Sequence, residues 1–435
     1  MSYLPNILFA IALVLGIGFF VKNIKKLTRN IKLGKDVDVS DNKSQRWGNM
    51  IRVALGQGKM TRRPIAGILH VIVYVGFIII NIEVLEIIID GLLGTHRIFS
   101  EIGSLYGVLI GSFEILAVLV LVSVILFWIR RNVIKLKRFW NSEMTSWPKN
   151  DANYILYFEM VLMSLFLIMN ATDVSFQAME SGNIISQYMS PWFSGFSEDS
   201  LHLVERTAWW LHILGILVFL NYLYYSKHLH ILLAFPNTFY ASVKPKGQLE
   251  NLESVTKEVM LMMDPNADPF AAPPEGEDSE EPEKFGASDV TDLNWVQLLS
   301  AYTCTECGRC TSSCPANLTG KKLSPRKIMM DVRDRLEEVG KNIDANKGTF
   351  QDDGKQLLDN YITKEELWAC TTCNACVEEC PVSISPLSII MDMRRYLVME
   401  QSSAPMELNN MMSNIENNGA PWPYSQMDRL NWKDE

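Results

Sequence analysis

Five apolar runs dominate the first 235 residues of the chain. Each is long enough, or nearly so, to cross a hydrocarbon core of about 30 Å as an α-helix. They lie at residues 4–21, 65–89, 105–129, 153–171 and 207–233. This pattern predicts a bundle of five transmembrane helices over residues 1–242.

The charges around these runs predict their orientation. The first run resembles a signal peptide in its position, but no basic residue precedes it and no small-residue cleavage pattern follows it, so we expect a retained anchor. Lys and Arg gather after the first and third runs, at residues 22–63 and 130–138. Because basic loops stay on the cytoplasmic side, we expect the N-terminus outside and residues 235–435 inside. The expected location is the inner (cytoplasmic) membrane of a bacterium, which the chain should cross several times.

Composition and net charge limit the kinds of molecule that this chain is expected to bind. Hydrophobic residues make up 48% of the 435 residues, which is high for an ordinary soluble protein. The formal charge of −9 excludes nucleic acid as a partner, since phosphate binding needs surplus Lys and Arg. Residues 243–290 are rich in Pro, Ala, Glu and Asp without apolar periodicity, which predicts a flexible linker rather than an acidic docking site. Residues 401–435 form a tail that is a candidate for partner docking.

The second half of the chain contains an internal repeat. All eight cysteines lie between residues 304 and 380, in two groups that both read C-x2-C-x2-C-x3-C-P. Each group is followed by a Ser-Pro pair that predicts the start of a helix, at Ser324 and Ser385. We therefore expect a duplicated α-helical domain over residues 291–400. The expected fold class is all-α, with a five-helix membrane bundle followed by a two-cluster ferredoxin domain.

The cysteine spacing is that of bacterial ferredoxins with two 4Fe-4S clusters. In that arrangement the first three cysteines of a group bind one cluster and the fourth binds the other. The expected ligands are Cys304, Cys307, Cys310 and Cys380 for one cluster, and Cys370, Cys373, Cys376 and Cys314 for the other. Zinc sites would also use eight cysteines, but their pairs are usually separated by a longer finger. A reducing compartment disfavours structural disulfides.

The six histidines all lie in the membrane half of the chain. His212 and His230 are eighteen residues apart, which on one continuous helix places both on one face about 27 Å from each other. His70 lies at a depth that matches His230, and haem iron in an electron carrier takes two axial ligands. We therefore expect His70 and His230 to bind one haem b near the cluster domain. The alternative is that each histidine hydrogen-bonds a neighbouring helix, and His228 would substitute for His230 if the helix were distorted.

A second haem near the outer face would use His212. Its preferred partner is His96, just past the second apolar run, and His202 is the other choice. Arg97 is a candidate to pair with a haem propionate, although a plain interfacial arginine explains it equally well.

Three carboxylates also fall at membrane depth, in the outer half of the predicted bundle. They are Glu83, Glu86 and Glu114. Because buried acids in lipid are costly and often mark proton routes, they are candidates for a quinone site. Structural hydrogen bonding between helices is the alternative.

Two resemblances follow from these motifs. Residues 65–235 resemble the five-helix haem b membrane subunit of respiratory nitrate reductases and of membrane-bound heterodisulfide reductases, in topology and in the pair His212 and His230. That nitrate reductase subunit has a second helix-two histidine where this chain has Ile80. Residues 300–422 resemble the iron-sulfur subunit of heterodisulfide reductases, including NIENNGAPW at 414–422. The resemblance implies that substrate chemistry occurs on a separate subunit, because no cysteine remains here for the catalytic module of that family.

The expected function is that of an oxidoreductase subunit in a quinone-linked respiratory complex. It would relay electrons between membrane quinone, one or two haem b groups, two 4Fe-4S clusters and a cytoplasmic catalytic partner with a cysteine-rich or flavin redox centre. No catalytic residue is expected on this chain. The main alternative is a haem-free membrane anchor whose clusters relay electrons among cytoplasmic proteins. An iron-sulfur redox sensor would need an output domain, and the sequence contains none that is recognisable.

Overall fold

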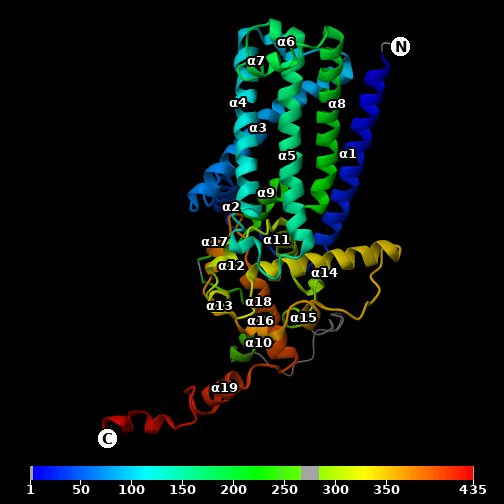
Figure 1. Ribbon diagram of the computed structural model, residues 1–435. Coiled ribbons are helices and arrows are strands. Elements are labelled where there is room, and N and C mark those ends of the chain that lie inside the picture. The colour runs from blue at the N-terminus through cyan, green and yellow to red at the C-terminus, as the bar shows by residue number, and fades with distance from the viewer. Residues whose placement is uncertain (1–2, 246, 266–283, 435) are drawn as a thin grey trace.

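The chain folds into a long helical bundle that stands on a smaller carboxy-terminal domain (Figure 1). The computed structural model describes residues 3–245, 247–265 and 284–434. Within these ranges the regular structure is helical, and the extended pairings are two isolated bridges. The expected all-α fold class is confirmed.

Five helices of the bundle are long and apolar enough to cross a membrane. They are α1 (Leu4–Ile31), α3 (Pro64–Leu93), α4 (Ser104–Asn132), α5 (Ser146–Thr172) and α8 (Glu198–Tyr222). Large apolar side chains cover much of the outer surface of these helices, as expected where lipid replaces water. The shorter elements of this half are α2 (Lys43–Met50), the π-helical turn η1 (Ile51–Leu55), α6 (Val174–Ala178), α7 (Ser186–Met189) and α9 (His230–Tyr240). We call the end of the bundle against the carboxy-terminal domain the near end, and the end with α6, α7 and the N-terminus the far end.

The predicted fifth span, 207–233, is not one helix. α8 ends at Tyr222, two 3-10 turns follow, and α9 begins at His230. Ser226 between the turns is extended, and its hydroxyl accepts a hydrogen bond from the backbone N–H of His228 at 3.1 Å. A serine that bonds the nearby backbone in this way competes with helical hydrogen bonding. The expectation that His212 and His230 lie on one face of a continuous helix is therefore wrong.

At the far end, Glu114 ties α4 to the loops that close the bundle. It is fully buried and accepts hydrogen bonds from Asn170 Nδ2 at 3.0 Å and from the backbone N–H groups of Ile185 at 2.7 Å and Ser186 at 3.0 Å. Three hydrogen-bond donors from two segments thus share one acceptor, the Glu114 carboxylate.

Replacing Glu114 with alanine should destabilise the protein by about 3 kcal/mol, because buried donors left without a partner cost on the order of 1 kcal/mol or more each. Thermal unfolding of the detergent-purified protein measures this effect. The exposed Glu101 lies at the same end, and Glu101→Ala should leave stability within about 0.5 kcal/mol of wild type. Equal stability of the two variants would contradict the proposed structural role of Glu114.

The carboxy-terminal domain is built from short helices around two longer ones. They are α11 (Trp295–Thr303), α12 (Arg309–Ser313), α13 (Pro315–Leu318), α14 (Pro325–Ala345), α15 (Leu357–Asn360), α16 (Lys364–Trp368), α17 (Ala375–Glu379) and α18 (Pro386–Arg395). Both Ser-Pro pairs start helices as predicted: the hydroxyl of Ser324 caps α14 and that of Ser385 caps α18. The equivalent residues Ile328 and Ile389 of these two helices are fully buried, so the repeat packs its two halves into one core.

This domain lies against the near end of the bundle (Figure 1), and buried hydrogen bonds hold it there. Asn30 at the end of α1 donates to the Tyr302 hydroxyl at 2.9 Å, and Asn237 on α9 donates to the Val382 carbonyl at 2.7 Å. Arg326, which is fully buried, pairs with Glu143 at 2.7 Å. Because buried polar groups are costly without partners, these contacts fix the domain relative to the bundle.

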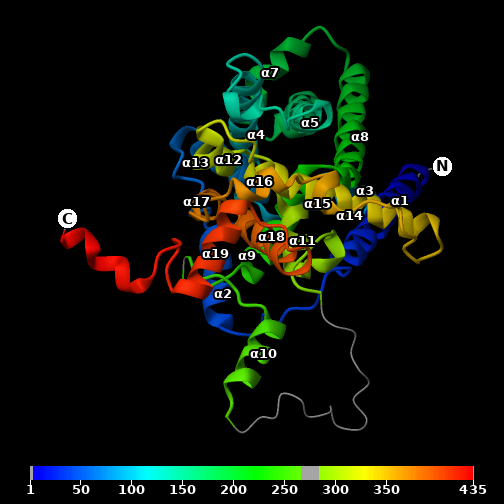
Figure 2. The ribbon, with the colours of Figure 1, turned by 90° about the horizontal axis from the view of Figure 1, so that it is seen from below.

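The predicted linker, 243–290, contains helix α10 (Glu253–Met263), and its last residues already belong to the carboxy-terminal domain. Asp289 there pairs with Arg335 at 2.8 Å. Residues 266–283 lie outside the described residues, so the flexibility expected for them is not addressed by the structure. The predicted tail contains α19 (Met406–Asn418) and the 3-10 helix η9 (Gln426–Lys433), which extend away from the domain (Figure 1). Seen from below, η9 also lies to one side of the domain (Figure 2).

Asp331 on α14 and Glu366 on α16 both form ion pairs with Lys327. Lys327 Nζ lies 2.7 Å from Asp331 Oδ2 and 3.0 Å from Glu366 Oε1. Burial raises the pKa of Asp331 to about 7, with Glu366 adding to the rise and Lys327 opposing it. The unfolded value is about 3.9, so the folded state holds more protons between these two pH values. The stability that this group contributes therefore falls as the pH rises from about 4 to about 7.

We expect the wild-type protein to gain about 1 kcal/mol relative to Asp331→Asn when the pH is lowered from 8 to 6, since asparagine does not titrate. Unfolding midpoints of both proteins at the two pH values measure the difference. Asp352→Asn, at an exposed position in the same domain, should follow the wild-type pH profile. A constant difference between wild type and Asp331→Asn would refute the assignment.

Candidate metal and cofactor sites

The eight cysteines line two cavities in the carboxy-terminal domain. The first cavity is lined by Cys304, Cys307, Cys310 and Cys380, and also by Cys376, which the second cavity shares. The second is lined by Cys314, Cys370, Cys373 and Cys376. The structure thus places the first three cysteines of each group together with the fourth cysteine of the other group.

The two cysteine loops share a backbone conformation. Glu306 and Thr372, each two residues after the first cysteine of its group, have φ values of 51° and 55°. Gly308 and Asn374, four residues after it, have φ values of 69° and 60°. The left-handed region suits glycine, is tolerated by asparagine and costs other residues energy. Since both loops adopt it at equivalent positions, their shape is a shared requirement of the cavity that each surrounds.

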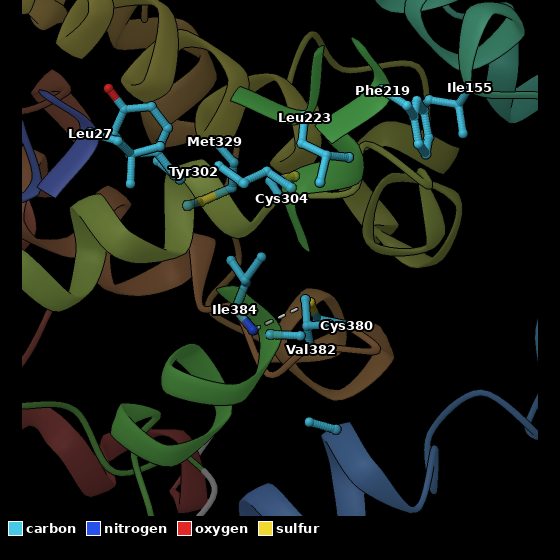
Figure 3. Packing of buried hydrophobic residues seen from close by; sticks show 14 of the residues in the cluster. Leu27, Ile155, Phe219, Leu223, Tyr302, Cys304, Met329, Cys380, Val382 and Ile384 are labelled. Carbon is cyan, nitrogen blue, oxygen red and sulfur yellow. Dashed lines mark hydrogen bonds between the residues drawn. The ribbon is translucent and has the colours of Figure 1, made fainter. Parts of the chain in front are cut away.

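A backbone N–H group donates to a cysteine sulfur in each of the two cavities. The N–H of Ile384 donates to Cys380 Sγ at 3.3 Å, and the N–H of Thr372 donates to Cys370 Sγ at 3.4 Å. Figure 3 shows the first of these bonds, with Cys380 among buried hydrophobic residues. Such bonds favour negative charge on sulfur and tune the potential of a bound iron-sulfur cluster.

The cavities suit a group larger than one ion. Within the described residues, no three His, Cys, Asp or Glu side chains are close enough together to hold a single metal ion. The four sulfurs of each set instead surround a space. Burial raises the pKa of the Cys304 thiol to about 12 and that of the Cys380 thiol to about 11. Thiols with these pKa values are neutral at pH 7 unless a metal displaces the proton, which a bound cluster would do.

The two cavities face different surroundings. Val382 and Arg326 line the first cavity, and both hydrogen-bond to the bundle half of the chain, to Asn237 and to the carbonyl of Arg138. Cys373 of the second cavity is exposed to solvent. The first cavity is therefore next to the bundle, and the second is accessible to a soluble molecule.

His70 on α3 and His230 at the start of α9 lie close together. Their ring centroids are 6.4 Å apart and the ring planes meet at 37°. Two imidazoles that bind one metal ion from opposite sides each form a bond of about 2 Å, which places the ring centres on the order of 6 Å apart. His230 Nδ1 lies 2.9 Å from the Lys227 carbonyl oxygen, as is usual for metal-bound histidines, while His70 Nδ1 is buried with no hydrogen-bond partner among the described residues. The spacing of the two rings is that expected of two histidines that hold one haem iron.

His212 on α8 has no second imidazole beside it. Its side chain is buried, Nδ1 lies 3.0 Å from the Leu162 carbonyl oxygen, and Nε2 has no partner. His96 Nε2 lies 3.2 Å from Asp173 and its side chain is 47% exposed, while that of His202 is 74% exposed. No contact joins either of them to His212 in the described part of the chain. The second haem, with His212 and His96 as ligands, stays a prediction that this arrangement does not support.

Arg97, the candidate for a haem propionate, is instead part of the far end of the bundle. It is buried and donates hydrogen bonds to Asp173 at 2.7 Å and to Asn170 at 2.9 Å. Its guanidinium also lies 4.1 Å from the centre of the Phe176 ring. These contacts give Arg97 a structural role.

Two of the three predicted membrane acids are hydrogen-bonded to the protein. Glu86 accepts from the Phe99 N–H at 2.9 Å and the Tyr106 hydroxyl at 3.2 Å, and Glu114 closes the far end as described above. Glu83 is 2% exposed, and its Oε2 has no partner. The alternative of structural hydrogen bonding therefore fits Glu86 and Glu114.

A short polar path joins the histidine pair to the first cavity. The Lys227 carbonyl oxygen lies next to His230 Nδ1, and Lys227 Nζ pairs with Glu306, which directly precedes Cys307. Glu306 also accepts a hydrogen bond from Arg333 at 2.6 Å. Neither Lys227 nor Glu306 was among the predicted site residues. The sequence feature that could have identified them is an ionisable residue adjacent to a candidate ligand segment.

Comparison with known proteins agrees with the cysteine sites. Residues 303–384 match the family described as "4Fe-4S dicluster domain", a range that contains both cysteine groups. The chain is 28% identical over 459 residues to the "Probable iron-sulfur-binding oxidoreductase FadF" of Bacillus subtilis, covering 99% of this chain and 61% of that protein. It is 24% identical over 444 residues to the "EtfAB:quinone oxidoreductase" of Syntrophomonas wolfei, covering 94% of this chain and 57% of that protein.

A shorter match links the chain to heterodisulfide reductases. Over 153 residues it is 29% identical to one subunit of the "Dihydromethanophenazine:CoB--CoM heterodisulfide reductase" of Methanosarcina mazei, covering 34% of this chain and 36% of that protein. No solved structure is significantly similar. The chain spans about three fifths of the length of the first two relatives. Its homologues are therefore iron-sulfur oxidoreductases and subunits of heterodisulfide reductases, and it shares with them a 4Fe-4S dicluster domain.

Proposed function

We propose that the chain is the membrane electron-transfer part of a quinone-linked oxidoreductase. It passes single electrons between a membrane quinone, a haem b held by His70 and His230, two 4Fe-4S clusters and a soluble partner. The observation that carries this proposal is the order of the sites: the histidine pair in the bundle, the first cavity below it, and the second cavity at the surface. Haem b would supply a one-electron carrier between the two-electron chemistry of quinone and the clusters.

The chain's own residues position these carriers. Cys304, Cys307, Cys310 and Cys380 hold the inner cluster, and Cys314, Cys370, Cys373 and Cys376 hold the outer one. The Lys227 carbonyl orients His230, and the ion pair of Lys227 with Glu306 fixes the bundle against the loop of the inner cluster. The exposed Cys373 marks where a soluble partner approaches.

The soluble partner is proposed to be a flavoprotein or a cysteine-rich redox subunit. The name of the Syntrophomonas wolfei relative pairs EtfAB with quinone, and the Methanosarcina mazei relative is a subunit of a heterodisulfide reductase. Either kind of partner would exchange electrons with the outer cluster. The direction of flow depends on the potentials of partner and quinone.

The proposed location is the inner membrane of a bacterium, with the carboxy-terminal domain in the cytoplasm. Basic residues that precede the second spanning helix contact that domain: Arg62 pairs with Glu378 at 2.6 Å and Arg63 with Glu379 at 3.2 Å. Since basic loops stay in the cytoplasm, the domain beside them is cytoplasmic too, and the far end with the N-terminus lies outside.

Metal and haem analysis of anaerobically purified protein tests the proposal. Two clusters require about eight iron atoms and eight acid-labile sulfides per chain, in addition to haem iron. The reduced-minus-oxidised spectrum should show a b-type band equivalent to one haem, since among the described residues His70 and His230 form the one histidine pair from two different helices. Zinc without sulfide would overturn the cluster assignment. Clusters without any haem band would favour the membrane-anchor alternative.

A further inference from the structure

His228 and Glu159 face each other in the near half of the bundle without a hydrogen bond. His228 lies in the turn between α8 and α9, and Glu159 lies near the middle of α5. Nε2 of His228 is 4.0 Å from Oε1 of Glu159, beyond direct hydrogen-bonding distance. No other hydrogen bond to either side chain exists among the described residues. The pair can therefore bind a third polar group that fits beside both.

The two side chains of this pair keep part of their surface accessible. The side chain of His228 is 15% exposed and that of Glu159 is 12% exposed, unlike the sealed acids of the far end. Glu159 lies on the same face of α5 as the buried residues Ile155, Leu162 and Met163, so its accessible surface opens on a space inside the bundle. Because helices long and apolar enough to cross a membrane surround this space, a ligand that enters it should be lipid-soluble, with a polar group for the pair to bind.

The pair also adjoins the proposed haem ligands. The ring centroid of His228 is 5.4 Å from that of His230 and 5.4 Å from that of Phe219. A ligand held by His228 Nε2 would therefore lie within a few ångströms of the electron path. This closeness favours a redox-active ligand over a structural lipid.

Polar contacts lie between this region and the carboxy-terminal domain. Asp151 lies two turns before Glu159 on α5 and accepts hydrogen bonds from the Tyr222 hydroxyl at 2.6 Å and the Lys227 N–H at 3.2 Å. Lys227 in turn pairs with Glu306 in the domain. Charged groups in a spanning segment are costly and often mark proton routes, and this line of groups leads to the near side of the membrane.

We propose that Glu159 and His228 form a quinone-binding site in the near half of the bundle, an inference that rests on the proposed function. One quinone oxygen is held between His228 Nε2 and Glu159 Oε1. On reduction, the quinone receives two electrons, one at a time, from the redox centres of the chain. The oxygen held by the pair takes one proton from the Glu159 carboxyl group, and the other oxygen takes one proton from the aqueous phase, so that quinol with two O–H bonds is formed. Oxidation of quinol reverses each of these transfers.

The far end offers the competing location. Glu83 there is 2% exposed, its Oε2 has no partner, and it is one of the acids expected from the sequence at a quinone site. Its carboxyl group is enclosed by the bundle, and its neighbours Glu86 and Glu114 are already hydrogen-bonded. Glu83→Gln is therefore the matched comparison for Glu159→Gln.

The test uses the full chain in nanodiscs and menadiol as the probe. In Glu159→Gln, menadiol should reduce the haem at least tenfold more slowly than in wild type, whereas dithionite should reduce the same amount of haem with an unchanged spectrum. Glu159→Asp should recover part of the rate. Glu83→Gln should behave as wild type. An unchanged rate in Glu159→Gln, or a loss of rate in Glu83→Gln alone, would overturn the inference.

A second measurement separates this inference from the proposed function. Equilibrium dialysis of labelled menadione reports binding whether or not haem is present, and binding should weaken at least tenfold in His228→Ala. If wild type contains no haem but shows this dependence, the electron-transfer proposal fails and the binding site stands. If His228→Ala instead removes the haem band and leaves menadione binding intact, His228 is an axial ligand and the site is refuted.

Discussion

Cys380→Ser should cost the protein one of its two clusters, although Cys380 belongs to the second cysteine group and the cluster belongs mainly to the first. The variant should retain about four of eight cluster iron atoms and the same share of sulfide. The reason is the crossed arrangement: Cys380 lines the first cavity with Cys304, Cys307 and Cys310. Serine is a poor substitute for a thiolate ligand, and a cubane with three protein ligands is prone to lose iron.

Double variants distinguish crossed from uncrossed ligation. With crossed ligands, adding Cys310→Ser to Cys380→Ser removes a second ligand of the same cluster, so one cluster remains. Adding Cys373→Ser instead damages both clusters, so none remains. The opposite pattern would show that each group holds its own cluster. Thr371→Ala, at an exposed position beside Cys370, should keep both clusters and serves as the control.

The features that could be predicted from the sequence are those encoded over short distances. Each cysteine group fits within eleven residues, and its loop repeats the same left-handed positions because the same local geometry is needed twice. The capping serines Ser324 and Ser385 bond to N–H groups three residues further on. The five apolar runs likewise depend only on composition over about 20 residues.

What the sequence did not predict depends on contacts between distant segments. His70 and His230 lie close together, but the assumption of one continuous helix through His230 fails at Ser226, where a side chain satisfies the backbone. α9 then packs against α11 and α2, which fixes His230 by tertiary contact. The place of His96 in the sequence favours it as a partner of His212, yet its side chain pairs with Asp173, 77 residues later.

The ion pair between the bundle and the carboxy-terminal domain likewise depends on contact between distant segments. Lys227 lies within the fifth apolar run and Glu306 lies in a cysteine loop. The composition of these two segments does not indicate that the two side chains form an ion pair. Their contact is what places the histidine pair beside the first cavity. Partner assignment of this kind requires the fold, because either residue alone is explained by solvation at a surface.

His70→Ala should abolish the b-type haem band while leaving both iron-sulfur clusters in place. The reason is that His70 and His230 are 6.4 Å apart between ring centroids and form the one imidazole pair across helices that suits an axial site in the described chain. Loss of one ligand leaves the iron without its second strong bond. Haem content should fall from about one per chain to near zero, and menadiol-driven reduction of the clusters should slow at least a hundredfold.

Optical spectroscopy and iron and sulfide analysis of the same sample measure both parts of this result. His202→Ala is the matched control, because His202 is 74% exposed at the far end and should leave the haem and the clusters unchanged. His212→Ala distinguishes a protein with one haem from a protein with two. With one haem the haem band keeps its full height, whereas a band of half the height would indicate a second haem at His212. A haem band that survives His70→Ala at full height would reject the histidine pair, and loss of the clusters along with the haem would point to misfolding instead of lost ligation.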